Sequence, residues 1–228
     1  MWVFPLAAAI VAALFASALA RRYVDRRRSY ELIWALAMLM YAGASLAVAF
    51  GVGNGWTSGA FRVYWALGAV LNVPFLAAGE LDLLVRRPGV RWTLVVLLAF
   101  ITAYTVAVVR TAEIHSAFLG EDLPSGKDVF GDGTAAHRLP QVVAIPAYLV
   151  LLGGTLWSAW RMRGRPELRD QFWGTLLIAF GATIIAGFGS AFAALGYLVP
   201  FSVSLLVGIG VMFVGFLRAA RRREPAPS

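Results

Sequence analysis

Two carboxylates and an amide interrupt a long apolar stretch in the first half of the sequence. Glu80 and Asp82 follow Asn72 and Pro74 within residues 61–85, where most other side chains are apolar. An ionisable group in apolar surroundings is costly unless it has a partner or faces a polar cavity. The pattern therefore indicates either a site for a proton or substrate, or a structural ion pair.

The spacing within this stretch separates the two carboxylates. Asp82 lies four residues before Arg86, on the same face of a helix, so that an ion pair is available. Glu80 lies about 200° around the helix from Asp82 and has Arg87 further along the chain. Glu80 is therefore the better candidate for a proton or substrate site. In the structural alternative both carboxylates lie near one membrane interface and pair with Arg86, Arg87 or a basic turn.

Four further residues of this stretch are candidates for binding. Pro74 frees a backbone carbonyl one turn earlier and kinks a helix, and Asn72 supplies an amide beside that gap. The pair predicts a polar binding point or a gate, or else a hydrogen bond between helices, which is the commoner use of Asn in membranes. Tyr64 could complete a pocket or pack with its hydroxyl satisfied. Arg62, at the outer end, could contact an anion, lipid headgroups or the acids of a later loop.

The rest of the sequence gives little support for an enzymatic or metal site. The sequence has no cysteine, which excludes disulfides, thiolate metal sites and thiol nucleophiles. It lacks the nucleophile-elbow, zinc-protease and phosphate-loop motifs, so that an enzyme is the less favoured class. Acids and both histidines gather in one segment, but their spacing fits no metal motif: Glu113, His115, Glu121, Asp122, Asp128, Asp132 and His137. We predict no catalytic residue, no metal and no cofactor.

The candidate residues must be positioned by helices that cross a membrane. The 228 residues are 60% hydrophobic and 14% charged, against about 45–50% and 25% in ordinary soluble domains. A transmembrane helix needs about 20 apolar residues, and seven segments qualify: 2–20, 30–52, 61–85, 92–110, 140–160, 171–194 and 197–217. We predict an all-α bundle of seven transmembrane helices in a single domain over residues 1–228, because an open strand would leave backbone groups unsatisfied in lipid.

The basic residues predict the orientation of the bundle. Sixteen of the twenty lie in four clusters, at 21–28, 86–91, 161–169 and 218–223, and the other four lie in the alternate connections. Since cytoplasmic connections carry the excess of Lys and Arg, we expect the amino terminus outside and the carboxy terminus in the cytoplasm, in a plasma (inner) membrane. The net charge of +8 then reflects anionic headgroups rather than nucleic acid.

Several segments outside the candidate stretch have patterns of their own. The outer connection 111–139 is unusually long, and such loops are commonly functional or disordered. The tail 224–228 is expected to fray. Residues 16–20 resemble a signal-peptidase site, but no basic residue precedes the apolar run, so that we expect the first helix to be retained. Glycines crowd 171–194 and 197–217, which predicts close packing of these helices.

A shift of 139 residues aligns the first three helices with the last three. It pairs Trp34 with Trp173, although basic turns before Trp-led runs would also align by composition. The arrangement of three helices, one helix and three helices resembles the SWEET and PQ-loop transporters, and Pro140-Gln141 resembles their PQ dipeptide. The resemblance implies a small-solute carrier. The chain departs from it with Pro5-Leu6 in the equivalent place and with no proline in 30–52 or 171–194.

The same topology also resembles the microbial rhodopsins. The run from Arg62 to Trp65 is similar to their Arg- and Trp-bearing helix. Those proteins hold retinal on a lysine of the seventh helix, whereas the only lysine here is Lys127 and residues 197–217 contain none. The resemblance therefore implies a rhodopsin-like scaffold that cannot bind retinal through a seventh-helix lysine.

Together these patterns favour an integral membrane protein that carries a small solute, with or without coupling to protons, along a pathway lined by residues 61–85. The alternative is a non-transporting receptor, sensor or accessory subunit. It would meet a small-molecule ligand or a partner membrane protein. A polar cavity that reaches the midplane would favour transport, and a closed apolar pocket would favour the receptor.

Overall fold

The computed structural model describes residues 1–120 and 122–220, and within these ranges the chain forms helices and no strand. Seven helical spans are long and apolar enough to cross a membrane, as an integral membrane protein requires. Four of the spans are single helices: α1 (Val3–Arg26), α2 (Ser29–Asn54), α5 (Pro88–Thr111) and α11 (Leu198–Ala220).

The third, fifth and sixth spans each contain a π-helical segment. The third span consists of α3 (Ser58–Tyr64), η1 (Trp65–Leu71) and α4 (Asn72–Leu84). The fifth consists of α7 (Ala135–Leu139), η3 (Pro140–Ala144) and α8 (Ile145–Met162). The sixth consists of η4 (Pro166–Leu168), α9 (Arg169–Thr183), η5 (Ile184–Gly189) and α10 (Ser190–Ala194). Two short helices, η2 (Ser116–Gly120) and α6 (Gly126–Phe130), lie between the fourth and fifth spans.

The predicted all-α fold with seven helices long and apolar enough to span a membrane is confirmed for the described residues, although the helix ends differ from the apolar runs. α1 continues to Arg26 because arginine is a good helix former. The fifth span begins at Ala135 rather than at 140, because the Thr134 hydroxyl accepts a hydrogen bond from the His137 amide (3.3 Å) and caps the helix. Glu121, the arginines at 221–223 and the predicted frayed tail 224–228 lie outside the described residues.

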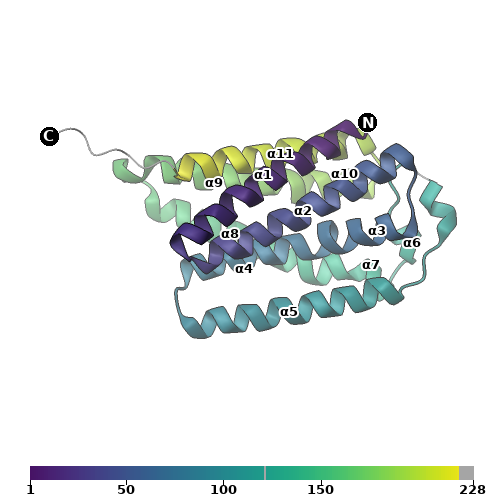
Figure 1. Ribbon diagram of the computed structural model, residues 1–228, viewed down its shortest axis with the longest axis horizontal. Helices are drawn as coiled ribbons and strands as arrows, with labels where there is room; N and C mark the ends of the chain where they lie inside the picture. The colour runs from purple at the N-terminus through teal and green to yellow at the C-terminus, as the bar shows by residue number, and fades with distance from the viewer. Residues whose placement is uncertain (121, 221–228) are drawn as a thin grey trace.

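Six of the spans close into a ring, and α5 lies outside it (Figure 1). Around the ring α1 packs against α2 and α11, α2 against α4, α4 against α8, and α9 against α8 and α11. α5 packs on the third span and on α7. Its side chains Trp92, Val96 and Phe100 are exposed, as expected for a helix surface that faces lipid.

The two ends of the bundle differ in chemistry. The loop end carries the amino terminus and the segment 112–134, and the arginine end carries the turns at 27–28, 85–87 and 163–165. Each span runs from one end to the other, so that every polar side chain within a span belongs to the loop half or to the arginine half.

The segment 112–134 folds as a packed cap over the loop end. Its Val129 and Phe130 side chains are buried, and the Trp56 indole donates a hydrogen bond to the Asp122 carbonyl (3.1 Å). Gly126 lies against Trp65 so closely that a Cβ at this position would overlap the indole ring. The long connection is therefore an ordered part of the fold within its described residues.

Glycines bring the sixth and seventh spans into backbone contact. A Cβ on Gly181 would lie 2.5 Å from the Gly208 carbonyl oxygen, and a Cβ on Gly174 would lie 2.5 Å from the Gly215 carbonyl oxygen. Without a hydrophobic driving force between helices in lipid, such close approach supplies the packing energy. The predicted glycine-mediated packing is thus present between α9 and α11.

We expect Gly181→Ala to lower the free energy of unfolding by about 1–3 kcal/mol, because the new methyl group must push two backbones apart. Gly210→Ala is the matched control, since nothing lies within 4 Å of a Cβ at that position of α11. Thermal unfolding in detergent compares the two variants with the parent. Equal stability of both variants would contradict the contact.

Candidate functional site

The three π-helical segments have local causes in the sequence. A proline ring clashes with the carbonyl four residues earlier and disrupts the helical hydrogen bonds there. Pro74 stands in this relation to Val70 of η1, and Pro146 stands in it to Val142 of η3. η5 has no such proline and instead contains Gly187 and Gly189. π-helical turns are rare and occur frequently at functional sites.

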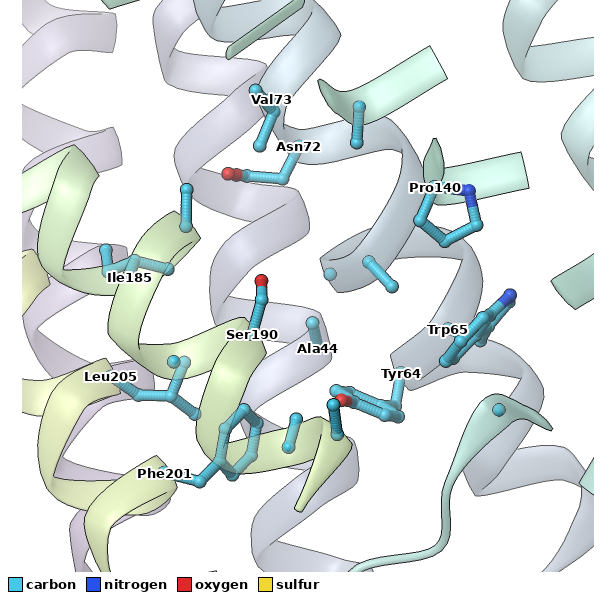
Figure 2. Close-up of a pocket in the computed structure, with 18 of the residues that line it drawn as sticks. Ala44, Tyr64, Trp65, Asn72, Val73, Pro140, Ile185, Ser190, Phe201 and Leu205 are labelled. Carbon is cyan, nitrogen blue, oxygen red and sulfur yellow. The ribbon is translucent and has the colours of Figure 1, made fainter. Parts of the chain in front are cut away.

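All three π-helical segments line one cavity in the loop half, which we call the loop-end cavity (Figure 2). Its volume is about 370 Å³. The third span contributes Tyr64, Trp65 and Asn72, the fifth contributes Pro140, and the sixth contributes Ser190. The walls are mostly apolar, and the few polar groups among them have the pattern of a small-molecule site.

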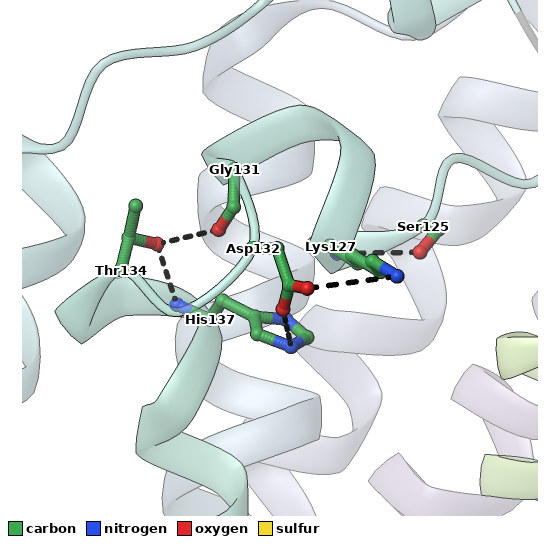
Figure 3. Close-up of polar contacts among 6 residues, drawn as sticks. All are labelled: Ser125, Lys127, Gly131, Asp132, Thr134 and His137. Carbon is green, nitrogen blue, oxygen red and sulfur yellow. Dashed lines mark hydrogen bonds and ion pairs between the residues drawn. The ribbon is translucent and has the colours of Figure 1, made fainter.

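Three residues that line this cavity, Ser125, Lys127 and His137, take part in a cluster of polar contacts (Figure 3). The Asp132 carboxylate lies 3.6 Å from the Lys127 ammonium and 3.7 Å from Nε2 of His137, and both partners line the cavity. The Thr134 hydroxyl donates to the Gly131 carbonyl (2.9 Å). No group of three His, Cys, Asp or Glu side chains within the described residues is arranged to hold a metal ion.

A second cavity, the arginine-end cavity, occupies the other half of the bundle. Its volume is about 760 Å³, and it is lined by two buried carboxylates, Glu31 and Glu80. Oε1 of Glu31 accepts a hydrogen bond from Nε of Arg22 (3.2 Å), and Oε1 of Glu80 accepts one from the Ser158 hydroxyl (3.2 Å). This cavity is more polar than the first and is bordered by arginines from several turns: Arg22, Arg26, Arg28, Arg86 and Arg161.

A small void of about 20 Å³ lies between the two cavities. Tyr41, Asn72 and Ile185 line both the void and the loop-end cavity. The side chains that line both the void and the arginine-end cavity are Met38, Leu76, Leu151 and Met212. The two cavities are therefore separated by the mostly apolar side chains that line this void, which we call the constriction.

The structure distributes the six candidates of the sequence analysis over different environments. Tyr64 and Asn72 line the loop-end cavity, and Glu80 lines the arginine-end cavity. Pro74, Asp82 and Arg62 do not belong to the lining of either cavity. All three lining residues come from the third span, so that this span contacts both cavities and the constriction.

Asp82 is a structural residue at the arginine end. Its carboxylate accepts hydrogen bonds from the Ser29 hydroxyl and from Nε of Arg91 (3.2 Å). Among the described residues the ion-pair partner is thus Arg91 of α5 rather than the expected Arg86. The reason is that α4 ends at Leu84, so that Arg86 does not continue the helical face on which Asp82 lies.

Arg62 closes the carboxyl end of α5. Its guanidinium donates to the carbonyl of Val109 and to that of Ala112 (2.8 Å). The last carbonyls of a helix have no partner within the helix, and a cation near them is stabilising. The structure therefore places the Arg62 guanidinium on the carboxyl end of α5.

Some site residues carry no distinctive signal in the sequence. Ser45 and Tyr148 line the loop-end cavity and Ser158 holds Glu80, yet each looks like an ordinary residue of an apolar run. Asn72 donates to the Ala37 carbonyl (2.7 Å), which is the interhelical use expected for a membrane Asn. Glu31 is the exception, because an acid at the start of an apolar run is visible in the sequence.

None of the protein-family models, curated proteins or solved structures compared with the chain matches it.

Removing either partner of the Asp82–Arg91 pair should have unequal effects on stability. Arg91→Ala leaves a carboxylate that is 2% exposed with only a hydroxyl partner, whereas Asp82→Asn leaves a guanidinium that is 52% exposed and can reach water. We expect a loss of about 1–3 kcal/mol for Arg91→Ala and less than about 1 kcal/mol for Asp82→Asn. Thermal unfolding in detergent measures both, and the reverse order would contradict this account of the pair.

Proposed function

We propose that this protein is a small-solute carrier whose pathway runs through the loop-end cavity, the constriction and the arginine-end cavity. The observation that carries the proposal is that two cavities, one in each half of the bundle, both share lining residues with the small void between them. A carrier needs access from both sides and a barrier between them. The third span borders all three parts of this pathway, in keeping with the candidates on it.

The arginine end is proposed to face the cytoplasm of a plasma membrane. The turns at this end and the helix ends that adjoin them hold most of the basic residues, and cytoplasmic connections carry that excess. With seven spans, the amino terminus then lies outside and the carboxy terminus inside. The loop-end cavity would receive solute from outside, and the arginine-end cavity would release it.

Passage of a solute requires the constriction to open, and two features support such movement. π-helical segments flank it on three spans, and helices can rearrange at such turns. The Gly181–Gly208 contact places two backbones side by side, with the Met212 side chain against Gly181 and the Ile185 side chain against Gly208. Movement of the sixth span against α11 would carry Ile185, which borders the constriction.

Glu80 is the proposed coupling residue of the pathway. It is 3% exposed, its hydrogen-bond partner among the described side chains is Ser158, and it lines the cavity on the far side of the constriction. A carboxylate buried within a span is costly unless a cation or water reaches it, and arginines border the same cavity. Solute movement and proton exchange at Glu80 would thus depend on the same opening.

Single-cysteine labelling tests the pathway directly, since the natural chain contains no cysteine. We expect Ala69→Cys to react with a membrane-impermeant thiol reagent only from the loop side and Leu84→Cys only from the arginine side, because each lines one cavity. Leu76→Cys, in the constriction, should react slowly from both sides as the protein cycles.

The lipid-facing variant Val96→Cys is the control for reagent that partitions into the bilayer. Complete protection of Leu76→Cys from both sides would argue against transport. Labelling of Ala69→Cys and Leu84→Cys from the same side would remove the two-cavity pathway.

Proton flux tests the role of Glu80. In proteoliposomes with an entrapped pH dye and an imposed potential, we expect Glu80→Gln to reduce protein-dependent proton entry at least about tenfold, since the amide cannot exchange a proton. Glu113→Gln, an exposed carboxylate of the cap, is the matched control. Flux that is unchanged in both Glu80→Gln and Asn72→Ala would exclude these residues from the mechanism.

The second candidate is a non-transporting receptor or sensor. Its support is the character of the loop-end cavity, which is mostly apolar and lies beneath the packed cap formed by the segment 112–134. A receptor would bind its ligand there and keep the constriction closed. Ligand binding without solute or proton flux in the same proteoliposomes would decide for this candidate.

A further inference from the structure

Three polar side chains of the loop-end cavity have hydrogen-bonding capacity that the protein does not use. Ser45 is 2% exposed, Asn72 is 4% exposed and Tyr64 is 8% exposed, so that each is more than nine-tenths buried. In the described part of the chain, no hydrogen bond is made by the Ser45 or the Tyr64 hydroxyl or accepted by Oδ1 of Asn72, and none of these three atoms is sealed inside the protein. Unpaired polar atoms that open to a mostly apolar cavity can bind a partner there.

The cavity itself is where that partner would lie. All three side chains belong to its lining, and Figure 2 shows Tyr64 and Asn72 on the third span bordering the same space. Nδ2 of Asn72 is occupied by the Ala37 carbonyl, which leaves only the acceptor oxygen of the amide. The two hydroxyls can donate or accept. The set is therefore complementary to a molecule that brings at least one hydrogen-bond donor.

The remaining walls suit an apolar, flat body. Tyr64 and Phe201 line the cavity in an edge-to-face arrangement with ring centroids 6.2 Å apart. Trp65 also lines it, and its indole N–H is occupied by the Ala136 carbonyl (2.9 Å), so that this residue offers ring surface rather than a donor. Aromatic rings bind other rings through offset or edge contacts.

Charge at the site disfavours an ionic ligand. Within the described residues no carboxylate lines the cavity, so that a cation would find no counter-charge. Lys127 and His137 line the mouth, but Asp132 already faces both at 3.6 and 3.7 Å. An anion bound beside Lys127 would meet repulsion from the Asp132 carboxylate.

We propose that the loop-end cavity binds an uncharged, mostly apolar molecule with a ring system and a hydroxyl or N–H donor, the donor directed to Ser45, Tyr64 and Asn72. The volume of about 370 Å³ lies within the range of small-molecule sites, about 300–1,000 Å³. Transport of such a ligand rests on the proposed carrier function, whereas its binding does not.

A series of probes that share one ring body separates the contributions of charge and donor. The probes are 2-(1-naphthyl)ethanol, 1-ethylnaphthalene, 1-naphthaleneacetate and 2-(1-naphthyl)ethylamine, added to the full chain in lipid nanodiscs. Ligand-observed saturation-transfer NMR measures binding, and empty nanodiscs correct for partition into lipid. We expect the alcohol to bind at least about tenfold more tightly than the two ions and about fivefold more tightly than the hydrocarbon.

Variants locate the binding. Tyr64→Phe keeps the ring and removes the hydroxyl, and should weaken binding of the alcohol about five- to tenfold without changing that of the hydrocarbon. Tyr104→Phe, on the exposed surface of α5, is the matched control. Ala69→Phe fills the cavity from η1 and should abolish binding of both probes, with the lipid-facing Val96→Phe as its control.

Three results would overturn the proposal: binding of an ion as tight as that of the alcohol, no binding of the alcohol at millimolar concentration, or binding that Ala69→Phe leaves intact in a folded protein. If the alcohol binds but no flux is found, the ligand site stands and the carrier function fails. If flux is found without binding of these probes, the carrier function stands and this ligand class fails.

Discussion

The bundle depends on the absence of a hydrophobic driving force between helices in lipid. Lipid tails solvate apolar side chains as well as neighbouring helices do, so that association must come from close backbone contact and from polar bonds. Here the contact comes from the glycine pairs of α9 and α11. The polar bonds between helices run from side chains to backbone carbonyls. The Tyr41 hydroxyl donates to the Leu205 carbonyl (2.9 Å), and the Trp34 indole donates to the Leu76 carbonyl (3.1 Å).

The two halves of the ring solve this problem differently. In the arginine half α8 packs against both α4 and α9, and ion pairs join neighbouring helices at their ends. In the loop half the third, fifth and sixth spans turn into π-helical segments, and the loop-end cavity lies among them. The cap formed by the segment 112–134 packs on this half, where Gly126 lies against Trp65 of η1. A cavity with unpaired hydroxyls thus lies among the three π-helical segments.

The sequence predicts the spans well because each apolar run must be about as long as the bilayer is thick. The arginine clusters mark the ends of these runs. The sequence also singles out Glu80 and Asn72, since polar groups are rare enough in lipid to stand out. The sequence does not predict which side chains or carbonyls these polar residues contact. The Asp82–Arg91 pair depends on where α4 ends, and the Arg62 cap depends on how α5 lies against α3, neither of which follows from periodicity. Ser45 is one small residue among many until the rotation of α2 is known.

α5 is joined to the third span at both of its ends. At the loop end it is held by the Arg62 guanidinium, and at the arginine end by the Asp82–Arg91 pair, while its outer surface meets lipid along its length. A change in bilayer thickness or lateral pressure that tilts this helix would also move the third span, which bears Tyr64, Asn72 and Glu80. Because it is bonded at both ends, α5 cannot tilt without a matching change in the third span.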